Sequence, residues 1–306
     1  MEEVIQIENV KKSFDSFEAI QNLTFSIQKG EIFGIIGPNG AGKTTTVEIV
    51  EGLQECSSGK VTVLGYDPWK DAKKLKENIG VMFQHTNLQP KIKVGEAVEL
   101  FASFYPRQID TTKALENLKL EPFRHTYFKN LSGGWKQKLL LTLATLHSPS
   151  IVFLDEPSTG LDPKSRRELW KMILSLRDAG TTIVLTTHYM EEAEQLCDRI
   201  ALMNHGSIVG LDTPQKLIQS LNKDKSILIA CKQLDIALIQ QIAGVSRVES
   251  KNNLLQIFTN NLEWTTFELF KFISTKGWIV DDFRFSTGSL DDLFVKLPQL
   301  KGEVML

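Results

Sequence analysis

Short apolar runs alternate with segments of helical period through the first part of the chain. The runs at 32–36, 151–154 and 182–186 are rich in Ile, Val and Leu, which is typical of parallel strands buried on both faces of a sheet. Between them lie helix signals such as Asp162-Pro163, a favoured N-cap followed by a favoured first helical residue. This alternation predicts an α/β fold with a parallel-sheet core. An opening strand is expected at 1–8, and helices at 43–50, 131–146 and 163–180.

A second group of helical segments interrupts these core elements. Residues 94–105 and 112–120 show the spacing of amphipathic helices, so a helical subdomain inserted at about 85–150 is expected. Phe101, Phe104 and Tyr105 fall within it. Aromatic residues at helical spacing usually belong to a core, and the alternative is that these three contact a partner protein.

The last part of the chain has its own pattern. A polar stretch near 219–225 marks a domain boundary, which divides the chain into domains 1–222 and 223–306. Apolar alternation beyond the boundary predicts a small α+β domain. Strands are expected at 227–230, 245–249, 254–258 and 278–285, and helices at 234–242, 265–275 and 289–296.

Composition narrows the class of protein. The 306 residues are 42% hydrophobic and 24% charged, as in globular domains. A net charge of -2 without a dense basic block argues against nucleic acid as a partner. The most apolar stretch, 139–154, is interrupted by His147-Ser-Pro-Ser150 and falls short of the ~20 residues of a membrane span. Three separated cysteines and an N-terminus unlike a signal peptide favour a reducing, cytoplasmic compartment.

Gly37-Pro-Asn-Gly-Ala-Gly-Lys-Thr44 has the spacing of a phosphate-binding loop. It follows an expected strand and precedes an expected helix, which is the context that this motif needs. Its glycines let backbone N–H groups surround phosphates, Lys43 can reach the β and γ oxygens, and the Thr44 hydroxyl can hold Mg²⁺. The loop therefore predicts a nucleotide site.

Two carboxylates and a histidine follow neighbouring strands. Asp155 and Glu156 end the run at 151–154, at the sheet edge where ligands gather in open α/β folds. We expect Asp155 to hold Mg²⁺ and Glu156 to act as the general base for an attacking water. His188 follows the run at 182–186, where its imidazole could contact a γ-phosphate.

Leu131-Ser-Gly-Gly134 begins another expected helix. Ser132 is a natural N-cap, and Gly133 and Gly134 expose N–H groups at the positive end of the helix dipole. Two glycines in a first turn cost up to ~1 kcal/mol each relative to alanine, which close approach to a phosphate explains better than capping alone. Since a lone nucleotide pocket has no use for this segment, we expect two such chains to face each other. Asp162 is expected as a helix cap, with a second role at that interface.

Together these residues resemble the ATP-binding subunits of ABC transporters over roughly residues 4–220. The resemblance implies a P-loop ABC ATPase domain with an antiparallel N-terminal β subdomain, and ATP and Mg²⁺ as cofactors. It adds Phe14 as the aromatic that stacks on adenine and Gln84 as a metal and water contact. The implied ATP-binding residues are Phe14, Gly37, Pro38, Asn39, Gly40, Ala41, Gly42, Lys43, Thr44, Thr45, Ser132, Gly133, Gly134 and Asp162; the catalytic residues are Glu156, His188 and Gln84; and the Mg²⁺ contacts are Thr44, Gln84 and Asp155.

One position departs from the family pattern. Trp135 stands where a glutamine often follows the Ser-Gly-Gly core, although Gln137 and Lys138 continue the pattern. The substitution bears on any polar contact made from that position. The core itself is intact, so an active ATPase is expected.

The domain beyond residue 222, ending in the segment 288–295, resembles the C-terminal extension of the ABC-2 exporter branch, which includes drug- and antibiotic-resistance efflux ATPases. This resemblance implies a peripheral subunit on the cytoplasmic side of the cell membrane that powers export through an ABC-2-type transmembrane permease. The ATPase would act as a homodimer or pseudo-symmetric dimer, head to tail, with two MgATP at the interface. Residues 85–90 and the following helix are candidates for permease contact. The extension would support or regulate the dimer, or merely pack on its host domain.

Other functions fit the sequence less well. A soluble ABC ATPase acting on ribosomes or nucleic acid is the main alternative. The ribosomal type usually fuses two cassettes and the DNA type inserts long coiled coils, and this sequence has neither pattern. A P-loop kinase or GTPase leaves Ser132 to Gly134 without a purpose, and Glu156 argues against a regulator that binds ATP without hydrolysing it. The cargo stays open among a peptide antibiotic, another drug, a lipid, a polysaccharide and an ion, and export rather than import rests on the branch resemblance.

Overall fold

The chain divides into two compact units. The computed structural model describes residues 2–83, 88–221, 225–231, 233, 236–251, 254–286 and 289–296. Its contacts separate a first unit that ends at Pro214 from a second unit at Gln215–Lys296. The division falls ahead of the expected boundary at 222, because the helix α8 (Pro214–Leu221) groups almost entirely with the second unit.

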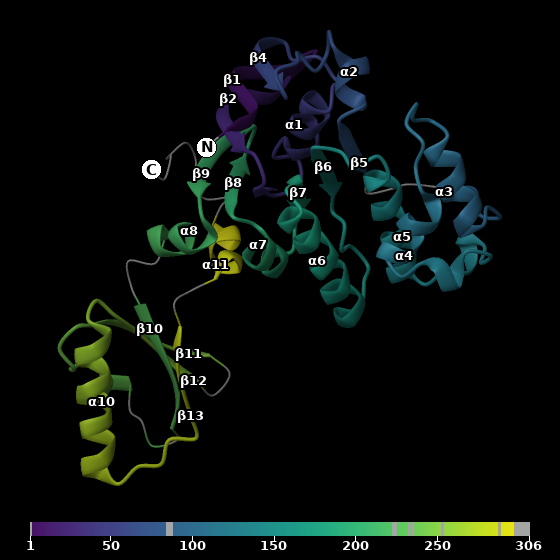
Figure 1. Ribbon diagram of the computed structural model, residues 1–306. Helices are drawn as coiled ribbons and strands as arrows, with labels where there is room; N and C mark the ends of the chain where they lie inside the picture. Colours follow the sequence, from purple (N-terminus) through teal and green to yellow (C-terminus); the bar gives the residue numbers. More distant parts are fainter. Residues whose placement is uncertain are drawn as a thin grey trace. The chain divides into compact units, whose positions relative to one another are not determined.

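A six-stranded sheet in the order β5-β6-β7-β3-β8-β9 forms the centre of the first unit (Figure 1). Neighbouring strands from β5 to β8 pair in parallel, and only β9 runs antiparallel to its neighbour β8. The parallel-sheet core predicted from the sequence is therefore confirmed. The strands are β5 (Ile79–Met82), β6 (Ile151–Asp155), β7 (Thr182–Thr187), β3 (Ile32–Ile36), β8 (Arg199–Asn204) and β9 (Ser207–Asp212).

An antiparallel sheet of three strands, in the order β2-β1-β4, shares its core with the large sheet. It consists of β1 (Glu3–Phe14), β2 (Phe17–Gln28) and β4 (Ser58–Val63). Phe25 of β2 stacks on Phe33 of β3, with ring centroids 5.4 Å apart, and the same cluster includes Val47 of α1 (Lys43–Val50). This layer holds the start of α1 against the central strands. The short helix α2 (Ala72–Lys76) precedes β5.

A group of helices lies beside the β5 edge of the sheet (Figure 1). It contains α3 (Val94–Ala102), α4 (Thr111–Asn117), α5 (Gly133–Thr145) and two 3₁₀ turns at Glu121–Phe123 and Phe128–Asn130. Leu residues of α4 and α5 form its buried core with Val94 and Val98. This is the expected helical subdomain, although α3 ends before the expected residue 105.

The three aromatic residues of this subdomain have different environments. Phe101 packs against the helical core, whereas Phe104 contacts Phe101 but is 66% exposed. Tyr105 stacks on His147, with ring centroids 4.1 Å apart. The core interpretation therefore holds for Phe101, and partner contact stays a prediction for Phe104.

Two helices follow the central strands that carry the candidate site. They are α6 (Pro163–Asp178) after β6 and α7 (Met190–Leu196) after β7. They pack on each other, and Arg166 of α6 makes a 2.9 Å ion pair with Glu191 of α7.

The second unit is a small α+β fold, as predicted. Its antiparallel sheet has the order β11-β12-β10-β13, with α10 against β10 (Figure 1). Ile227, Ile257 and Leu269 are among its fully buried residues. The elements are β10 (Lys225–Ala230), α9 (Ile236–Ile239), β11 (Val245–Lys251), β12 (Leu254–Thr259), α10 (Leu262–Lys276), β13 (Asp282–Ser286) and α11 (Leu290–Lys296).

Gly80 of β5 allows α5 to lie close to the sheet. A Cβ at this position would stand 1.9 Å from the carbonyl oxygen of Ala144, and backbone atoms cannot move aside as a flexible side chain can. We expect Gly80→Ala to lower the free energy of unfolding by about 2 kcal/mol, as overpacked substitutions do, measured by urea denaturation.

Gly133→Ala is the matched control. Its Cβ would meet only Leu161 Cδ2 at 3.6 Å, an ordinary contact, so the free energy of unfolding should not fall and should rise by up to about 1 kcal/mol, as expected when alanine replaces a helical glycine. Equal stability of Gly80→Ala and the wild type would contradict the close packing of β5 and α5.

Candidate active site

The loop between β3 and α1 has the backbone geometry of a phosphate cradle. Gly40 and Gly42 adopt left-handed conformations, with φ of 79° and 97°, which residues with a side chain rarely adopt. A Cβ on Gly42 would also stand 2.7 Å from the carbonyl oxygen of Ala19, and one on Gly37 would stand 2.2 Å from that of Met203. Conformation therefore requires glycine at position 40, space requires it at position 37, and both require it at position 42.

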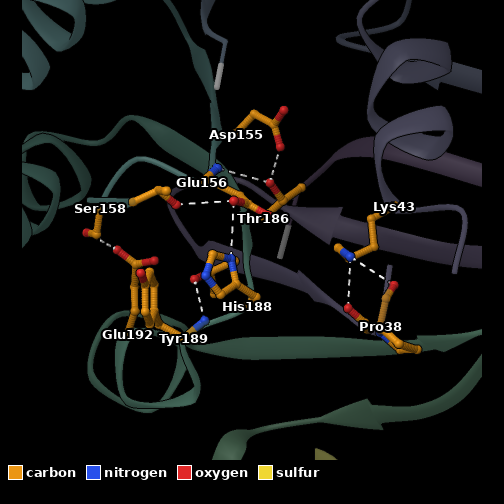
Figure 2. Close-up of polar contacts among 12 residues, drawn as sticks. Pro38, Lys43, Asp155, Glu156, Ser158, Thr186, His188, Tyr189 and Glu192 are labelled. Carbon is orange, nitrogen blue, oxygen red and sulfur yellow. Dashed lines mark hydrogen bonds and ion pairs between the residues drawn. The ribbon is translucent and has the colours of Figure 1, made fainter. Parts of the chain in front are cut away.

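Lys43 is held within this loop at the first residue of α1. Its Nζ donates to the carbonyl oxygens of Gly37 and Pro38 at 2.8 and 3.1 Å (Figure 2). The residue is only 9% exposed, and this burial lowers the pKa of the ammonium, while Glu156 and Asp155 act in the opposite direction. Lys43 thus places a positive charge beside the two carboxylates that end β6.

Asp155 and Thr186 meet across the β6–β7 pair. The two residues are register partners at the ends of their strands, and Thr186 Oγ1 donates to Asp155 Oδ1 (Figure 2). This hydrogen bond fixes the Oδ1 atom of the Asp155 carboxylate. Thr186 was not among the residues predicted for the site, although aligning the starts of the two predicted strands, Ile151 with Thr182, would have placed it opposite Asp155.

Glu156 has a left-handed backbone conformation with φ of 46°, which costs about 1–3 kcal/mol in a residue other than glycine. Its N–H donates to the carbonyl oxygen and the hydroxyl of Thr186 at 3.1 and 3.2 Å. Its carboxylate Oε2 accepts a 3.1 Å hydrogen bond from Thr159. These contacts hold a strained residue in place, a common property of functional sites.

His188 contacts Glu156 directly. Its Nδ1 lies 3.1 Å from Glu156 Oε2 (Figure 2). The His188 side chain is 41% exposed and the Glu156 side chain is 14% exposed. The structure therefore brings together the predicted general base and the predicted γ-phosphate contact. Gln84 and residues 85–87, also predicted to act here or at the permease, lie outside the described residues.

Asp162 caps α6 as expected. Its Oδ1 accepts from the N–H groups of Lys164 and Ser165 at 3.0 Å, and its Oδ2 accepts from the Ser165 hydroxyl at 2.6 Å. Hydrogen bonding to Ser165 is the main reason that the pKa of this carboxyl is lowered. The cap is thus fully formed within one chain, and a second role for Asp162 at a dimer interface stays a prediction.

The segment 131–134, at the start of α5, differs in detail from expectation. Ser132 occupies the N-cap position of α5, but its hydroxyl makes no capping hydrogen bond. A Cβ on Gly134 would stand 2.7 Å from Ser165 Oγ, so packing between α5 and α6 is enough to require this glycine. Gly133 has no such neighbour within 3.6 Å. Close approach of a ligand remains the better explanation for Gly133 alone.

Trp135 turns toward the helical core. Its ring lies 4.3 Å from that of Phe123, and the Lys138 ammonium lies 4.0 Å from its centroid. Lys138 in turn makes a 2.7 Å ion pair with Glu168 of α6. The indole therefore packs inside the helical subdomain, where the family often has a polar glutamine. It also contacts Lys138, whose ion pair with Glu168 links α5 to α6.

Phe14 ends β1 and is 41% exposed. The residue is the register partner of Phe17 across the β1–β2 turn, and Lys12 Nζ lies 4.8 Å from the centroid of the Phe14 ring. An exposed aromatic face is suited to stacking on a base. The adenine contact stays a prediction.

The described residues suit MgATP. Among them, no cluster of three or more His, Cys, Asp or Glu forms a metal cage, but Mg²⁺ needs only one or two protein ligands when phosphates and water supply the rest. Thr44 and Asp155 would hold the ion, whose positive charge would offset the negative charge of the phosphates. Lys43 would bind the phosphate oxygens, and Glu156 would take a proton from water.

Glu51, at the C-cap of α1, is a buried acid that the sequence did not reveal. It is 3% exposed, and burial raises its pKa to about 8, with Asp155 and Glu48 adding to the effect. Between its ordinary pKa of 4.5 and about 8 the folded chain therefore binds a proton that the unfolded chain has released. Stability contributed by this proton is lost as pH rises through that window.

Glu51→Gln should remove this pH dependence. We expect the variant to unfold with about 2–4 kcal/mol more free energy than the wild type at pH 9, and with nearly the same free energy at pH 5. Urea denaturation of the nucleotide-free chain across this range measures the difference. Parallel pH profiles for the two chains would contradict the raised pKa.

Comparisons with known proteins agree with this geometry. The ABC transporter family model matches residues 20–159. The linearmycin resistance ATP-binding protein of Bacillus subtilis is 33% identical over 250 residues, which cover 80% of each chain. The Nod factor export ATP-binding protein I of Burkholderia lata is 38% identical over 221 residues, covering 71% of this chain and 73% of that protein.

A solved structure shows the same architecture. A dimeric ATP-binding cassette in a post-hydrolysis state, bound to ADP and Pi, aligns with a TM-score of 0.60 and 26% identity, over 68% of this chain and 98% of its own. Its alignment supports the fold of the first unit, and the two curated relatives extend the match through most of the chain. The phosphate loop and the Asp155–Glu156 strand end lie within the matched residues 20–159, and the chain belongs to the ABC transporter family as an ATP-binding subunit with ATPase activity.

Proposed function

We propose that this ATPase powers export through a separate transmembrane permease. The observation that carries the proposal is the contact of Glu156 with His188, next to Asp155 in the chain, which supports a general base acting beside a γ-phosphate contact. The direction of transport is supported by the relatives, one named for resistance to linearmycin and another for Nod factor export. An ABC-2-type permease and a drug or antibiotic cargo are the specific forms that we favour.

The chain would act at the cytoplasmic face of the membrane as a peripheral subunit. In the part of the chain that the structure describes, no helix is long and apolar enough to cross a bilayer. A permease would therefore supply the membrane path for the cargo. Exposed Phe104, on the segment after α3, is a candidate contact for that subunit.

Hydrolysis would occur between two copies, or between this chain and a similar one. Ser132 and Gly133 start α5, which packs on β5, α3 and α6, whereas the phosphate loop precedes α1. A facing subunit would bring its own Ser132 and Gly133 to the ATP held by Lys43. The dimeric post-hydrolysis cassette bound to ADP and Pi supports this arrangement by analogy.

Glu156→Gln tests the general base and the dimer together. The amide keeps the shape of the side chain but cannot accept a proton from water, so we expect ATP turnover to fall by at least about 100-fold. ATP should then remain bound, and the variant should elute as a dimer in size-exclusion chromatography with MgATP and as a monomer without it.

Glu77→Gln, on the exposed surface, is the control and should behave as the wild type. Wild-type turnover by Glu156→Gln would refute the general base. The partner is tested separately by purifying the chain from its native membranes: recovery of ribosomes or nucleic acid in place of a permease would favour a soluble ABC ATPase and refute the transport role.

A further inference from the structure

A buried polar cluster connects the loop from Glu156 to Asp162 with the helices α6 and α7. It consists of Ser158, Trp170 and Glu192, which are 1%, 7% and 0% exposed. The Trp170 indole N–H donates to Glu192 Oε1 at 2.9 Å and to Ser158 Oγ at 3.2 Å, and Ser158 Oγ donates to Glu192 Oε1. One carboxyl oxygen therefore joins two side chains from separate segments.

The same carboxyl group is expensive to bury. Glu192 Oε2 has no hydrogen-bond partner although it is inaccessible to solvent, and an unsatisfied buried polar atom costs about 1–3 kcal/mol. An apolar side chain of similar size would avoid that penalty. The stability of the fold alone therefore does not explain a glutamate here, whereas a need to hold Ser158 and Trp170 does.

The Ser158–Glu192 contact joins the same two chain segments as the Glu156–His188 contact. Ser158 follows Glu156 by two residues, and Glu192 lies one helical turn after His188. Glu156 and His188 touch at 3.1 Å, so two contacts cross between the same two chain segments. Figure 2 shows both, with Ser158–Glu192 beside Glu156–His188.

Trp170 adds a third anchor from α6. This helix begins at the Asp162 cap, so the loop from Glu156 to Asp162 is held at its start by Thr186, in its middle by Glu192, and at its end by its own cap. The loop cannot shift relative to α7 unless the Ser158–Glu192 contact breaks. The position of Glu156 relative to His188 therefore depends on Glu192.

We propose that Glu192 is a positioning residue for ATP hydrolysis. Its carboxyl acts through Ser158 and Trp170, keeps the general base Glu156 in contact with His188, and itself touches neither nucleotide nor water. The proposal rests on ATP hydrolysis at this site and is independent of export, cargo and permease.

Glu192→Leu and Glu192→Gln separate positioning from packing. Leucine removes the acceptor, and we expect kcat for ATP to fall roughly 10- to 100-fold, the scale associated with a misplacement of about 1 Å. KM for ATP should stay within about twofold, because the phosphate loop is untouched. Glutamine keeps an acceptor oxygen and should retain at least about half of the wild-type kcat.

Thr182→Val is the matched control for lost stability. Thr182 is 1% exposed and accepts a 2.9 Å hydrogen bond from the Gly30 N–H at the opposite end of β7. It should lower the melting temperature without changing kcat at 25 °C. If Glu192→Leu does not fold, Ser158→Ala removes the donor instead and should lower kcat with the same unchanged KM.

The ring NMR signals of His188 supply a readout without nucleotide. They can be assigned by comparison with His188→Asn, and we expect them to shift in Glu192→Leu and to stay in place in Thr182→Val and Glu192→Gln. Wild-type kcat together with unshifted His188 signals in Glu192→Leu and Ser158→Ala would overturn the proposal. Failure of the general base is distinct, because it appears as turnover by Glu156→Gln.

Discussion

The parallel pairing of β6 with β7 places Asp155 opposite Thr186, and the rest of the site depends on this register. The Thr186 hydroxyl binds the Asp155 carboxylate, and both its hydroxyl and its carbonyl oxygen accept from the Glu156 N–H. A shift of one residue would turn these side chains to the other face of the sheet. One strand pair therefore sets the direction of the Asp155 carboxylate and the position of Glu156 at the start of the following loop.

The site holds conformations that the chain would not adopt without support. Glu156 has a positive φ, and Lys43 and Glu51 are ionisable groups largely removed from water. Each carries a free-energy cost that packing elsewhere in the first unit must offset. The stacked rings of Phe25 and Phe33 join the two sheets of this unit, and α1 packs against the same hydrophobic cluster.

Sequence reasoning was most successful where chemistry demands a fixed spacing. The phosphate loop, the strand before Asp155 and the strand before His188 were identified because Gly, Lys, Thr and apolar runs carry local meaning. Thr186, Glu51 and Glu192 were missed, since their roles arise from neighbours far away in the chain. For Gly134 the sequence context indicated close approach of a phosphate, whereas the close packing of Ser165 explains why a glycine stands there. The boundary before α8 also depends on tertiary contacts.

The most direct test of the account is the steady-state ATP turnover of Thr186→Val, measured with its melting temperature. Valine keeps the branched shape and the strand, but it removes the hydroxyl that binds Asp155 and the Glu156 N–H. If the β6–β7 register organises catalysis through this hydroxyl, kcat should fall at least about tenfold while the chain remains folded at the assay temperature. Wild-type turnover by this variant would contradict the central claim.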